Sequence, residues 1–361
     1  MLQFDFEALG ALGLTPALAS RAVAAYGGRE DEARLVRITE VHRETVTCHD
    51  GVAERSARTL PRLARTLIDA HTALAAGDWA IATVDAFGQP WIIDRVPPTS
   101  HITRRDADAR RHPVVSNVDI AVLVMGLDDD FNPRRLERFI AMVHDEAIVP
   151  IVVLTKADIV PTLQLLAERI AAVRTRVPAH VDIVAVDATA PAAAEALRPY
   201  VAAGRTLVML GSSGAGKSTL TNTLLGAHVQ DTGAVREADG RGKHTTTSRS
   251  LHRLPGGACV IDTPGVRTLR PDGDEASLAE SFGDIEALAA TCRFRDCQHG
   301  TEPGCAVRSG VDADRLRNYQ KLLREVRRDA LTALDRQRQL AQFKVRGRAV
   351  KARMKMKRGV A

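Results

Sequence analysis

The alternation of hydrophobic and polar positions between Ala33 and about Val96 has the period of short β-strands. Strands are expected at four runs: Val36 to Thr39, Val41 to Val46, Ala80 to Val84 and Trp91 to Val96. Turn signals such as Asp50-Gly51 and Gly77-Asp78 separate them. A module of about 60 residues with about five short strands fits a small barrel of the OB type, and a small sandwich without a ligand is the alternative. Residues 1–32, rich in Ala and Leu, are expected to be helical in part.

From Asp119 onward, continuous apolar runs alternate with amphipathic helical patterns. The runs predict buried strands at Ile120 to Met125, Val149 to Leu154, Val181 to Val186 and Thr206 to Leu210. Helices are expected at 133–145, 163–173 and 192–201, and further helical stretches at about 312–342. This rhythm predicts a mostly parallel α/β sheet covered on both faces, with ligands bound at the carboxyl ends of its strands.

A phosphate-binding loop follows the last of these strands. It has the sequence Gly-Ser-Ser-Gly-Ala-Gly-Lys-Ser and opens a helix that carries Leu220 and Leu224. The expected nucleotide contacts are Gly211, Ser212, Ser213, Gly214, Ala215, Gly216, Lys217, Ser218 and Thr219. The glycines let backbone N–H groups approach a polyphosphate, Lys217 supplies a positive charge to its β- and γ-phosphates, and Ser218 offers its hydroxyl to Mg²⁺.

Two segments after this loop have the positions of nucleotide switches. Asp262 ends a short apolar strand and is a candidate magnesium residue, and the N–H of Gly265 would lie near the γ-phosphate. The loop from Gly240 to Thr247 lacks an apolar period, and either Thr246 or Thr247 would complete the magnesium shell. His244 is a candidate to position the attacking water or to contact a partner. Val266 stands where many GTPases have a water-orienting Gln, which predicts slow intrinsic turnover.

Upstream of the phosphate loop, the strand at 149–154 ends in Thr155-Lys156-Ala157-Asp158, a guanine-reading signature. Asp158 would accept hydrogen bonds from the N1–H and amino group of guanine, and the stem of Lys156 would lie over the base. The backbone N–H of Ala188, after the next strand, is a candidate contact to the guanine O6. In an ordinary G domain this signature follows the phosphate loop, so the order of the motifs indicates a circular permutation.

A cluster of cysteines and one histidine follows the sheet. Cys292, Cys297, His299 and Cys305 have the spacing C-x₄-C-x-H-x₅-C, which suits a closed, structural zinc site; free thiols are the alternative. Metal binding would contribute much of the folding of this segment. Cys48 and Cys259 stand alone and are expected to be ordinary buried residues.

Charge and composition indicate what kind of partner the protein binds. Hydrophobic residues make up 45% of the chain and the net charge is +6. Residues 344–358 carry eight Lys or Arg and no acid, which favours an anionic partner, nucleic acid before membrane, over a merely solvated tail. Arg104-Arg105 and Arg110-Arg111 add to this. No apolar window approaches a membrane span, and Asp5 and Glu7 argue against a signal peptide, so a cytoplasmic protein is expected.

Together these motifs resemble the circularly permuted GTPases of the RsgA/YjeQ type. Further matches are Gly77-Asp78-Trp79, Ser116-Asn117-Val118-Asp119, the segment from Asp130 to Arg138, and Tyr319 with Lys321-Leu322. The resemblance covers about residues 33–330. It departs from the family at Thr155, where the usual residue is Asn, at Asp187, where Ser is common, and at Lys243 in an expanded switch loop; the first two would weaken guanine binding.

The resemblance implies an α/β P-loop G domain, circularly permuted, with an N-terminal OB-type barrel and a small C-terminal zinc-binding helical domain. The expected boundaries are an extension at 1–32, the OB domain at 33–98, the GTPase domain at 99–270, the zinc-binding domain at 271–343 and a basic tail at 344–361. It further implies GTP hydrolysis stimulated by the small ribosomal subunit, in late maturation of that subunit. Mg²⁺, one Zn²⁺ per chain and a monomer that binds the small subunit and its rRNA are expected.

Two other functions remain open from the residues. An ATP-dependent P-loop enzyme explains the phosphate loop but leaves Asp158 and the zinc cluster without a role. An RNA-binding assembly protein with vestigial hydrolysis is the third possibility. Competition between GTP and ATP for binding distinguishes the ATP-dependent enzyme from the GTPase. Substitution of Lys217 tests the assembly protein, which would lose nucleotide binding and keep its cellular function.

Overall fold

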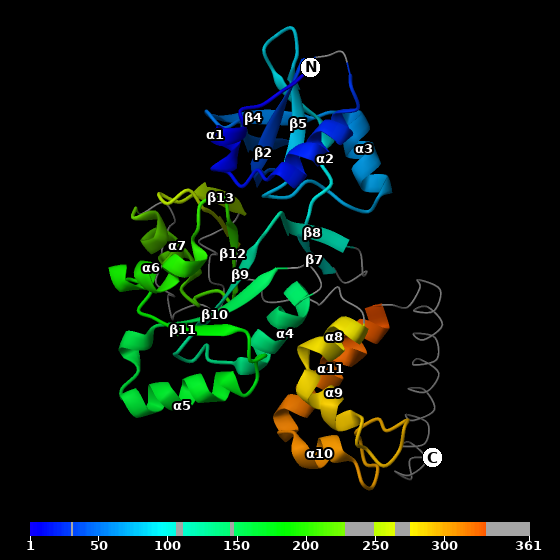
Figure 1. The fold of residues 1–361 in the computed structure, drawn as a ribbon, viewed down its shortest axis with the longest axis vertical. Helices are drawn as coiled ribbons and strands as arrows, with labels where there is room; N and C mark the ends of the chain where they lie inside the picture. The colour runs from blue at the N-terminus through cyan, green and yellow to red at the C-terminus, as the bar shows by residue number, and fades with distance from the viewer. Residues whose placement is uncertain (30–31, 106–110, 145–147, 228–248, 264–274, 330–361) are drawn as a thin grey trace, which may run out of the picture. The chain divides into compact units, whose positions relative to one another are not determined.

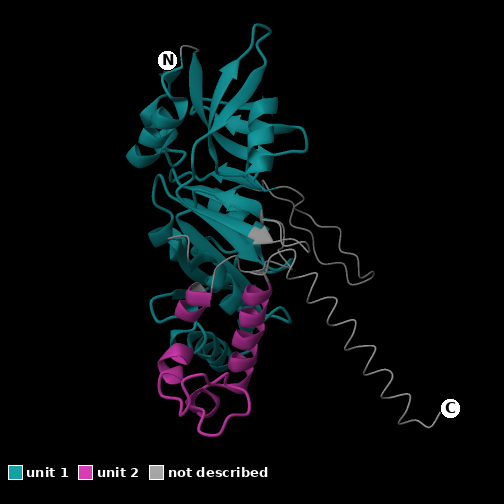
Figure 2. Cartoon of the chain, turned by 90° about the vertical axis from the view of Figure 1, so that its right-hand side faces the viewer, with its two compact units in different colours: residues 1–272, 281–283 teal, residues 273–280, 284–361 magenta. Residues whose placement is uncertain are grey.

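The computed structural model describes residues 1–29, 32–105, 111–144, 148–227, 249–263 and 275–329. The chain divides into two compact units, shown in Figure 2. Unit 1 comprises residues 1–272 and 281–283, and unit 2 comprises residues 273–280 and 284–361. Within the described ranges, none of the helices is long and apolar enough to span a lipid bilayer.

The first part of unit 1 is a closed five-stranded barrel (Figure 1). Its strands are β2 (Ala33–Val41), β3 (Thr45–His49), β4 (Glu54–Thr59), β5 (Trp79–Val84) and β6 (Pro90–Arg95), with helix α3 (Pro61–Asp69) between β4 and β5. The strands pair in the order β2-β3-β4-β6-β5, and pairing of β5 with β2 closes the barrel. The expected barrel of the OB type is therefore confirmed, and the sandwich is excluded.

One expected strand in this region is wrong. The run from Val41 to Val46 straddles a hairpin turn, in which the His42 N–H donates to the Thr45 carbonyl at 2.9 Å. Val41 ends β2, and Val46 belongs to β3. The four polar residues between the two valines, His42 to Thr45, mark the turn in the sequence.

Residues ahead of the barrel cover part of it. A short strand β1 (Leu2–Gln3) pairs in parallel with β2. Helices α1 (Phe6–Gly10) and α2 (Pro16–Tyr26) follow, as the partly helical expectation requires. Thr15 caps the start of α2 and Gly27 ends it at φ +64°. The buried side chains of Leu18, Ala22 and Tyr26 belong to the core cluster that also holds Trp79 of the barrel.

The second part of unit 1 is the expected parallel sheet. Its strands are β9 (Ile120–Gly126), β10 (Val149–Thr155), β11 (Asp182–Ala185), β12 (Thr206–Gly211) and β14 (Cys259–Asp262), with β13 (Ser250–Arg253) antiparallel to β14. They run in the order β11-β10-β9-β12-β14-β13. Ser250 of β13 also pairs with Glu40 of β2, so the sheet continues into the barrel.

Helices cover both faces of this sheet because its strands are apolar on both sides. Alternate residues such as Leu123, Val152 and Val208 share a core with α4 (Pro133–Val143) and α5 (Leu163–Arg174). Their neighbours Val122, Val153 and Met209 share the second core with α6 (Pro191–Leu197) and α7 (Lys217–Leu225). A short 3₁₀ turn (Arg198–Tyr200) extends α6, and the hairpin of β7 (His101–Arg105) and β8 (Arg111–Ser116) links the barrel to β9.

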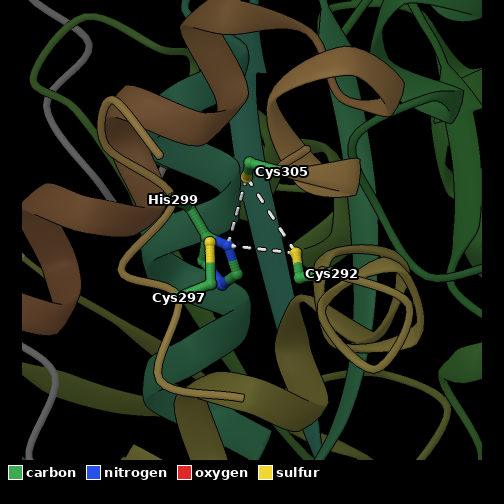
Figure 3. Close-up of side chains that lie close together, drawn as sticks. All are labelled: Cys292, Cys297, His299 and Cys305. Carbon is green, nitrogen blue, oxygen red and sulfur yellow. Dashed lines mark hydrogen bonds between the residues drawn. The ribbon is translucent and has the colours of Figure 1, made fainter. Parts of the chain in front are cut away.

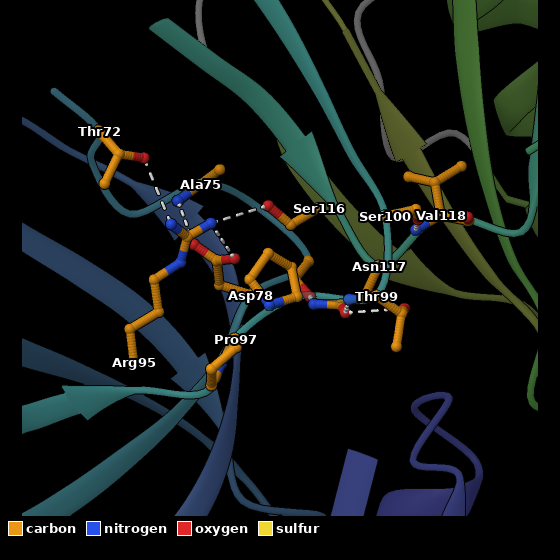
Figure 4. Close-up of polar contacts among 12 residues, drawn as sticks. Thr72, Ala75, Asp78, Arg95, Pro97, Thr99, Ser100, Ser116, Asn117 and Val118 are labelled. Carbon is orange, nitrogen blue, oxygen red and sulfur yellow. Dashed lines mark hydrogen bonds and ion pairs between the residues drawn. The ribbon is translucent and has the colours of Figure 1, made fainter. Parts of the chain in front are cut away.

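Two of the motifs shared with the RsgA/YjeQ type meet at this junction (Figure 4). Asn117, at φ +53°, donates through Nδ2 to the Gly77 carbonyl at 2.9 Å and accepts the Thr99 N–H at 3.0 Å. A Cβ at Gly77 would lie 2.1 Å from the Ser116 carbonyl oxygen, so only glycine fits there. Buried Asp78 pairs with Arg95 at 2.8 Å. These contacts fix the end of the barrel to the segment that enters β9.

Unit 2 is helical, with α8 (Glu275–Ser281), α9 (Gly283–Ala289), α10 (Ala306–Gly310) and α11 (Ala313–Asp329). Buried Arg315 of α11 donates two hydrogen bonds, of 2.8 and 2.6 Å, to the Asp284 carboxylate. The Tyr319 hydroxyl donates to Glu286 at 3.0 Å. These contacts join α11 to α9 and hold the segment between them, which carries the Cys/His cluster.

Candidate functional site

The three nucleotide motifs lie at the carboxyl ends of parallel strands in one sheet. Thr155 ends β10, Gly211 ends β12 and Asp262 ends β14. Strand β9 lies between β10 and β12, and β14 pairs with the other side of β12. The carboxyl edge of such a sheet is where α/β proteins bind ligands. The fold thus brings the base signature and the phosphate loop to the same edge, as the sequence predicted.

The phosphate loop connects β12 to α7 through two residues in the left-handed region. Gly214 has φ +82° and Gly216 has φ +90°. A residue with a Cβ atom would be sterically strained in this conformation, so glycine is favoured at both positions. At Gly211, a Cβ would lie 2.4 Å from the Val124 carbonyl oxygen, so the loop starts in close contact with β9. The sequence spacing of the glycines follows from these constraints.

Lys217 lies inside this loop and is buried. Its ammonium donates to the Ser212 carbonyl at 2.7 Å and to the Gly211 carbonyl at 3.1 Å. Burial lowers the pKa of Lys217, while Asp262 and Asp130 oppose that shift. An anionic ligand in the loop would stabilise the charged ammonium as these two carboxylates do.

Ser218 and Asp262 form the candidate magnesium site. The Ser218 hydroxyl donates to Asp262 Oδ2 at 3.0 Å, and the Asp262 side chain is fully buried. Burial raises the pKa of the Asp262 carboxyl. Its second oxygen, Oδ1, has no hydrogen-bond partner among the described residues. A buried carboxylate with an unpaired oxygen beside a hydroxyl fits a hard divalent cation.

Thr155 faces the phosphate loop. Its buried hydroxyl donates to the Ala215 carbonyl at 2.6 Å, a link between positions 60 residues apart. A Cβ at Gly216 would lie 3.2 Å from the same hydroxyl. The shorter reach of Thr relative to Asn is therefore sufficient for a contact with the loop, and Thr155 joins the base signature to the phosphate site.

The rest of the base signature is partly or fully exposed. Lys156 has φ +60°, which turns the chain into a 3₁₀ helix (Ala157–Ile159), and its ammonium pairs with the Asp128 carboxylate. Asp158, on that short helix, is exposed. The carboxylate is thus accessible to a ligand at the same edge of the sheet as the phosphate loop.

The loop after β11 is attached to the phosphate-loop helix. The Thr223 hydroxyl of α7 donates to the carbonyl of buried Ala188 at 2.6 Å. Asp187 accepts the N–H and the hydroxyl of Thr189 at 2.8 and 2.7 Å, and the hydrogen bond from the Thr189 side chain lowers the pKa of this carboxyl. The negative charge of Asp187 is therefore held within its own turn.

Sequence reasoning assigned no chemistry to the segment that follows β9, yet two of its acids contact the site. Asp128 pairs with Lys156 of the base signature, and Asp130 accepts the hydroxyl of Ser212 in the phosphate loop. Arg135 pairs with Asp130 as well. The partners are 28 and 82 residues away in the chain, so no local pattern indicates these contacts.

In unit 2, the four residues expected to bind zinc converge (Figure 3). Their candidate ligand atoms all lie within 4.8 Å of one another. The His299 Nδ1 lies 3.7 Å from Cys292 Sγ and 3.5 Å from Cys305 Sγ, and the two sulfurs are 4.0 Å apart. Ligands of one tetrahedral zinc ion would lie roughly 3.6–3.8 Å apart, so the cluster of Cys292, Cys297, His299 and Cys305 fits Zn²⁺.

Several expected site residues lie outside the described residues. These are Lys243, His244, Thr246 and Thr247 of the first switch segment, Gly265 and Val266 of the second, Arg110, and the basic residues of the tail. The side chains of Arg104, Arg105 and Arg111 are likewise not described. Their expected roles stay predictions.

Comparison with known proteins agrees with this geometry. Residues 95–271 match the family of RsgA GTPases. The chain is 44% identical over 303 residues to the small ribosomal subunit biogenesis GTPase RsgA of Xanthomonas oryzae pv. oryzae (strain MAFF 311018), covering 82% of this chain and 81% of the relative. The RsgA of Xanthomonas axonopodis pv. citri (strain 306) has the same identity and coverage.

Solved structures show the same fold at lower sequence identity. The crystal structure of YjeQ from Thermotoga maritima has a TM-score of 0.58 at 22% identity and covers 81% of this chain and 98% of its own. That of YloQ, a circularly permuted GTPase, has a TM-score of 0.55 at 20% identity, with 83% and 97% covered. On the family match, the identity to the curated relatives and the permuted order of its motifs, the chain belongs to the RsgA family of circularly permuted GTPases.

Proposed function

We propose that this protein hydrolyses GTP in the biogenesis of the small ribosomal subunit, as the name of its relatives states for them. One observation carries the proposal. The phosphate loop and the guanine signature lie at the same edge of one sheet, and the Thr155 hydroxyl joins them through the Ala215 carbonyl at 2.6 Å. A guanine nucleotide bound across that edge would contact both motifs.

Each motif has a defined task in this reaction. Lys217, now hydrogen-bonded to the carbonyls of the loop, would turn to the β- and γ-phosphates and offset their charge. Backbone N–H groups of the loop from Gly211 to Thr219 would cradle the phosphates. Asp158 would select guanine, with the Lys156 stem over the base and the Ala188 N–H on O6.

Ser218 and Asp262, with Thr246 or Thr247, are proposed to hold Mg²⁺, which neutralises phosphate charge when bound. The N–H of Gly265 is proposed to contact the γ-phosphate. Val266 cannot orient a water molecule, so slow turnover of the isolated protein is expected, with stimulation by the small subunit. His244 is the candidate for positioning water.

The zinc cluster is proposed to be structural. Three thiolates and one imidazole leave no open position for a reactant. The His299 carbonyl accepts a hydrogen bond from Gln320 of α11 at 3.1 Å, so the metal loop is fixed to the long helix. One zinc ion per chain would therefore set the shape of the surface that unit 2 presents.

Charge distribution supports rRNA as the partner. On α11, Arg317, Lys321, Arg324 and Arg328 are exposed and recur at helical spacing along one side. They span about 16 Å at about 1.5 Å per residue. On the barrel, Arg58 of β4 and Arg62 and Arg65 of α3 are exposed. Such stripes suit contacts to a phosphate backbone.

A binding assay tests the rRNA contact. Reversing charge with Lys321→Glu and Arg324→Glu should weaken binding to purified small subunits and flatten its dependence on salt. Binding that does not respond to salt would contradict recognition of the RNA backbone.

We further propose that the protein acts in the cytoplasm, as a monomer.

Hydrolysis assays test the function as a whole. Purified protein should hydrolyse GTP slowly, hydrolyse it faster with small ribosomal subunits, and leave ATP intact. Lys217→Ala should abolish hydrolysis. Equal hydrolysis of ATP would favour a different P-loop enzyme, and a rate unaffected by small subunits would contradict the proposed partner.

A further inference from the structure

The loop between β9 and α4, residues 127–132, is an acidic segment placed against the phosphate loop. It begins after Gly126, and the Asp128 carboxylate lies against this glycine, since a Cβ there would be 2.4 Å from Asp128 Oδ1. Its backbone is fixed to the base signature because the Leu127 N–H donates to the Thr155 carbonyl at 2.9 Å. The Phe131 N–H closes a turn on the Asp128 carbonyl at 3.0 Å. The loop is therefore a well-supported platform.

From this platform Asp130 reaches the phosphate loop. One carboxylate oxygen accepts the hydroxyl of Ser212, the residue whose carbonyl also binds the Lys217 ammonium at 2.7 Å. Ser212 is buried. The other oxygen of Asp130 pairs with Arg135 on the first turn of α4. Two hydrogen bonds therefore fix Ser212: its hydroxyl donates to Asp130, and its carbonyl accepts from Lys217.

The phosphate loop has a second external support at its other end, where Thr155 binds the Ala215 carbonyl. The contacts at Ser212 and Ala215 therefore support the loop at two points, on either side of Ser213 and Gly214. A loop that is already held in this shape loses less conformational freedom when a polyphosphate binds.

An acid beside a phosphate site would repel the ligand unless its charge were offset. Arg135 supplies that offset, since its guanidinium pairs with the same carboxylate. The Asp130–Arg135 pair therefore supports the loop through a strong hydrogen-bond acceptor without adding net charge next to the phosphates.

We propose that Asp130 is a positioning residue for nucleotide binding, which acts by holding Ser212, and that Arg135 neutralises its charge. The inference rests on the proposed function, since it takes a guanine nucleotide as the ligand of the loop.

A double-mutant cycle on GDP and GTP affinity tests the link. Ser212→Ala and Asp130→Ala should each weaken both nucleotides by roughly tenfold, the loss of one charge-assisted hydrogen bond. The double variant should be no weaker than either single variant, because both remove the same contact. Asp130→Asn keeps an acceptor for the Ser212 hydroxyl and should stay within about threefold of the native protein.

Arg135→Gln provides a readout that a merely structural role would not change. It leaves the Asp130 charge unbalanced, so GTP, the more highly charged nucleotide, should lose more affinity than GDP. Asp129→Ala is the matched control, an exposed acid of the same loop, and should leave both affinities unchanged.

The outcomes separate this inference from the proposed function. If the native protein binds neither nucleotide, both fail. If the native protein binds and Lys217→Ala abolishes binding, but Ser212→Ala has no effect, only the inference fails. Effects of Ser212→Ala and Asp130→Ala that multiply would also overturn it. Should Asp130→Ala not fold, Ser212→Ala alone tests the contact, because it removes the hydroxyl that Asp130 accepts.

Discussion

The Ser218 hydroxyl lies 3.0 Å from Asp262 Oδ2, which brings the start of α7 and the end of β14 together at one point. The two residues are 44 positions apart. The contact places a hydroxyl and a buried carboxylate beside Lys217, where the phosphates of a bound nucleotide would need a cation. The pair is the structural basis of the proposed magnesium site.

Asp262→Asn should reduce GTP hydrolysis by about 100-fold or more, because the charge that would attract Mg²⁺ is lost. Nucleotide affinity measured with and without EDTA provides the check. In the native protein affinity should depend on Mg²⁺, and in the variant this dependence should disappear. A variant that keeps the full effect of Mg²⁺ would show that Asp262 does not take part.

Thr155→Val preserves the shape of a buried side chain and removes its hydroxyl. The Ala215 carbonyl would lose the hydrogen bond that it now accepts at 2.6 Å. GDP affinity should fall by roughly tenfold, while the preference for guanine over adenine should persist, since Thr155 faces the loop and not the base. Thr155→Ser, which keeps the hydroxyl, is the control. A loss of base preference in the valine variant would place Thr155 at the base instead.

The sequence predicted those features that depend on local chemistry. The phosphate loop, the base signature and the zinc ligands are short motifs whose residues meet because of glycine conformations or parallel strands. The role of Thr155 and the contacts of Asp128 and Asp130 could not be predicted, because their partners lie on other strands or loops. The contact from Asp130 to Ser212 spans 82 residues.

The barrel shows where pattern reading fails. The segment from Val41 to Val46 begins and ends with an apolar residue and is polar in between. This pattern predicts one strand, but the segment contains a turn. Strand β4 was not expected because exposed polar side chains occupy most of it, and only Ala57 is fully buried. Its place is fixed by pairing with β3 and β6, which no single segment encodes.

Removing zinc should unfold unit 2 while unit 1 stays folded. The zinc loop has few apolar residues, so metal binding supplies much of its folding free energy. Cys297→Ser or treatment with a chelator should abolish the helical signal and protease resistance of residues 275–329 in the full chain. GDP binding by unit 1 should remain. Retention of the native protease pattern after complete zinc removal would contradict a structural metal.

Tyr319 predicts a defined response to alkaline pH. Burial, with the neighbouring Glu286 carboxylate, raises the pKa of Tyr319 to about 12. The unfolded value is about 10, so the protonated hydroxyl stabilises the fold fully below that pH. This contribution is lost as the pH rises through about 12.

Tyr319→Phe isolates that effect, because it deletes the hydroxyl that donates to Glu286 at 3.0 Å. At neutral pH the variant should be less stable by about 1–3 kcal/mol. The difference in unfolding free energy between native protein and variant should shrink above about pH 10. A difference that stays constant to the highest pH measured would show that Tyr319 does not titrate as described.

The most direct test of the account concerns Asp158, whose carboxylate is proposed to read guanine on a nucleotide whose phosphates bind Lys217. Asp158→Asn replaces an acceptor with a donor, which matches xanthine, where an oxygen stands in place of the amino group of guanine. Binding of GTP and XTP to native and variant protein should be measured side by side. The variant should lose affinity for GTP by about 100-fold or more and gain affinity for XTP. A variant that binds GTP as well as the native protein does would contradict it.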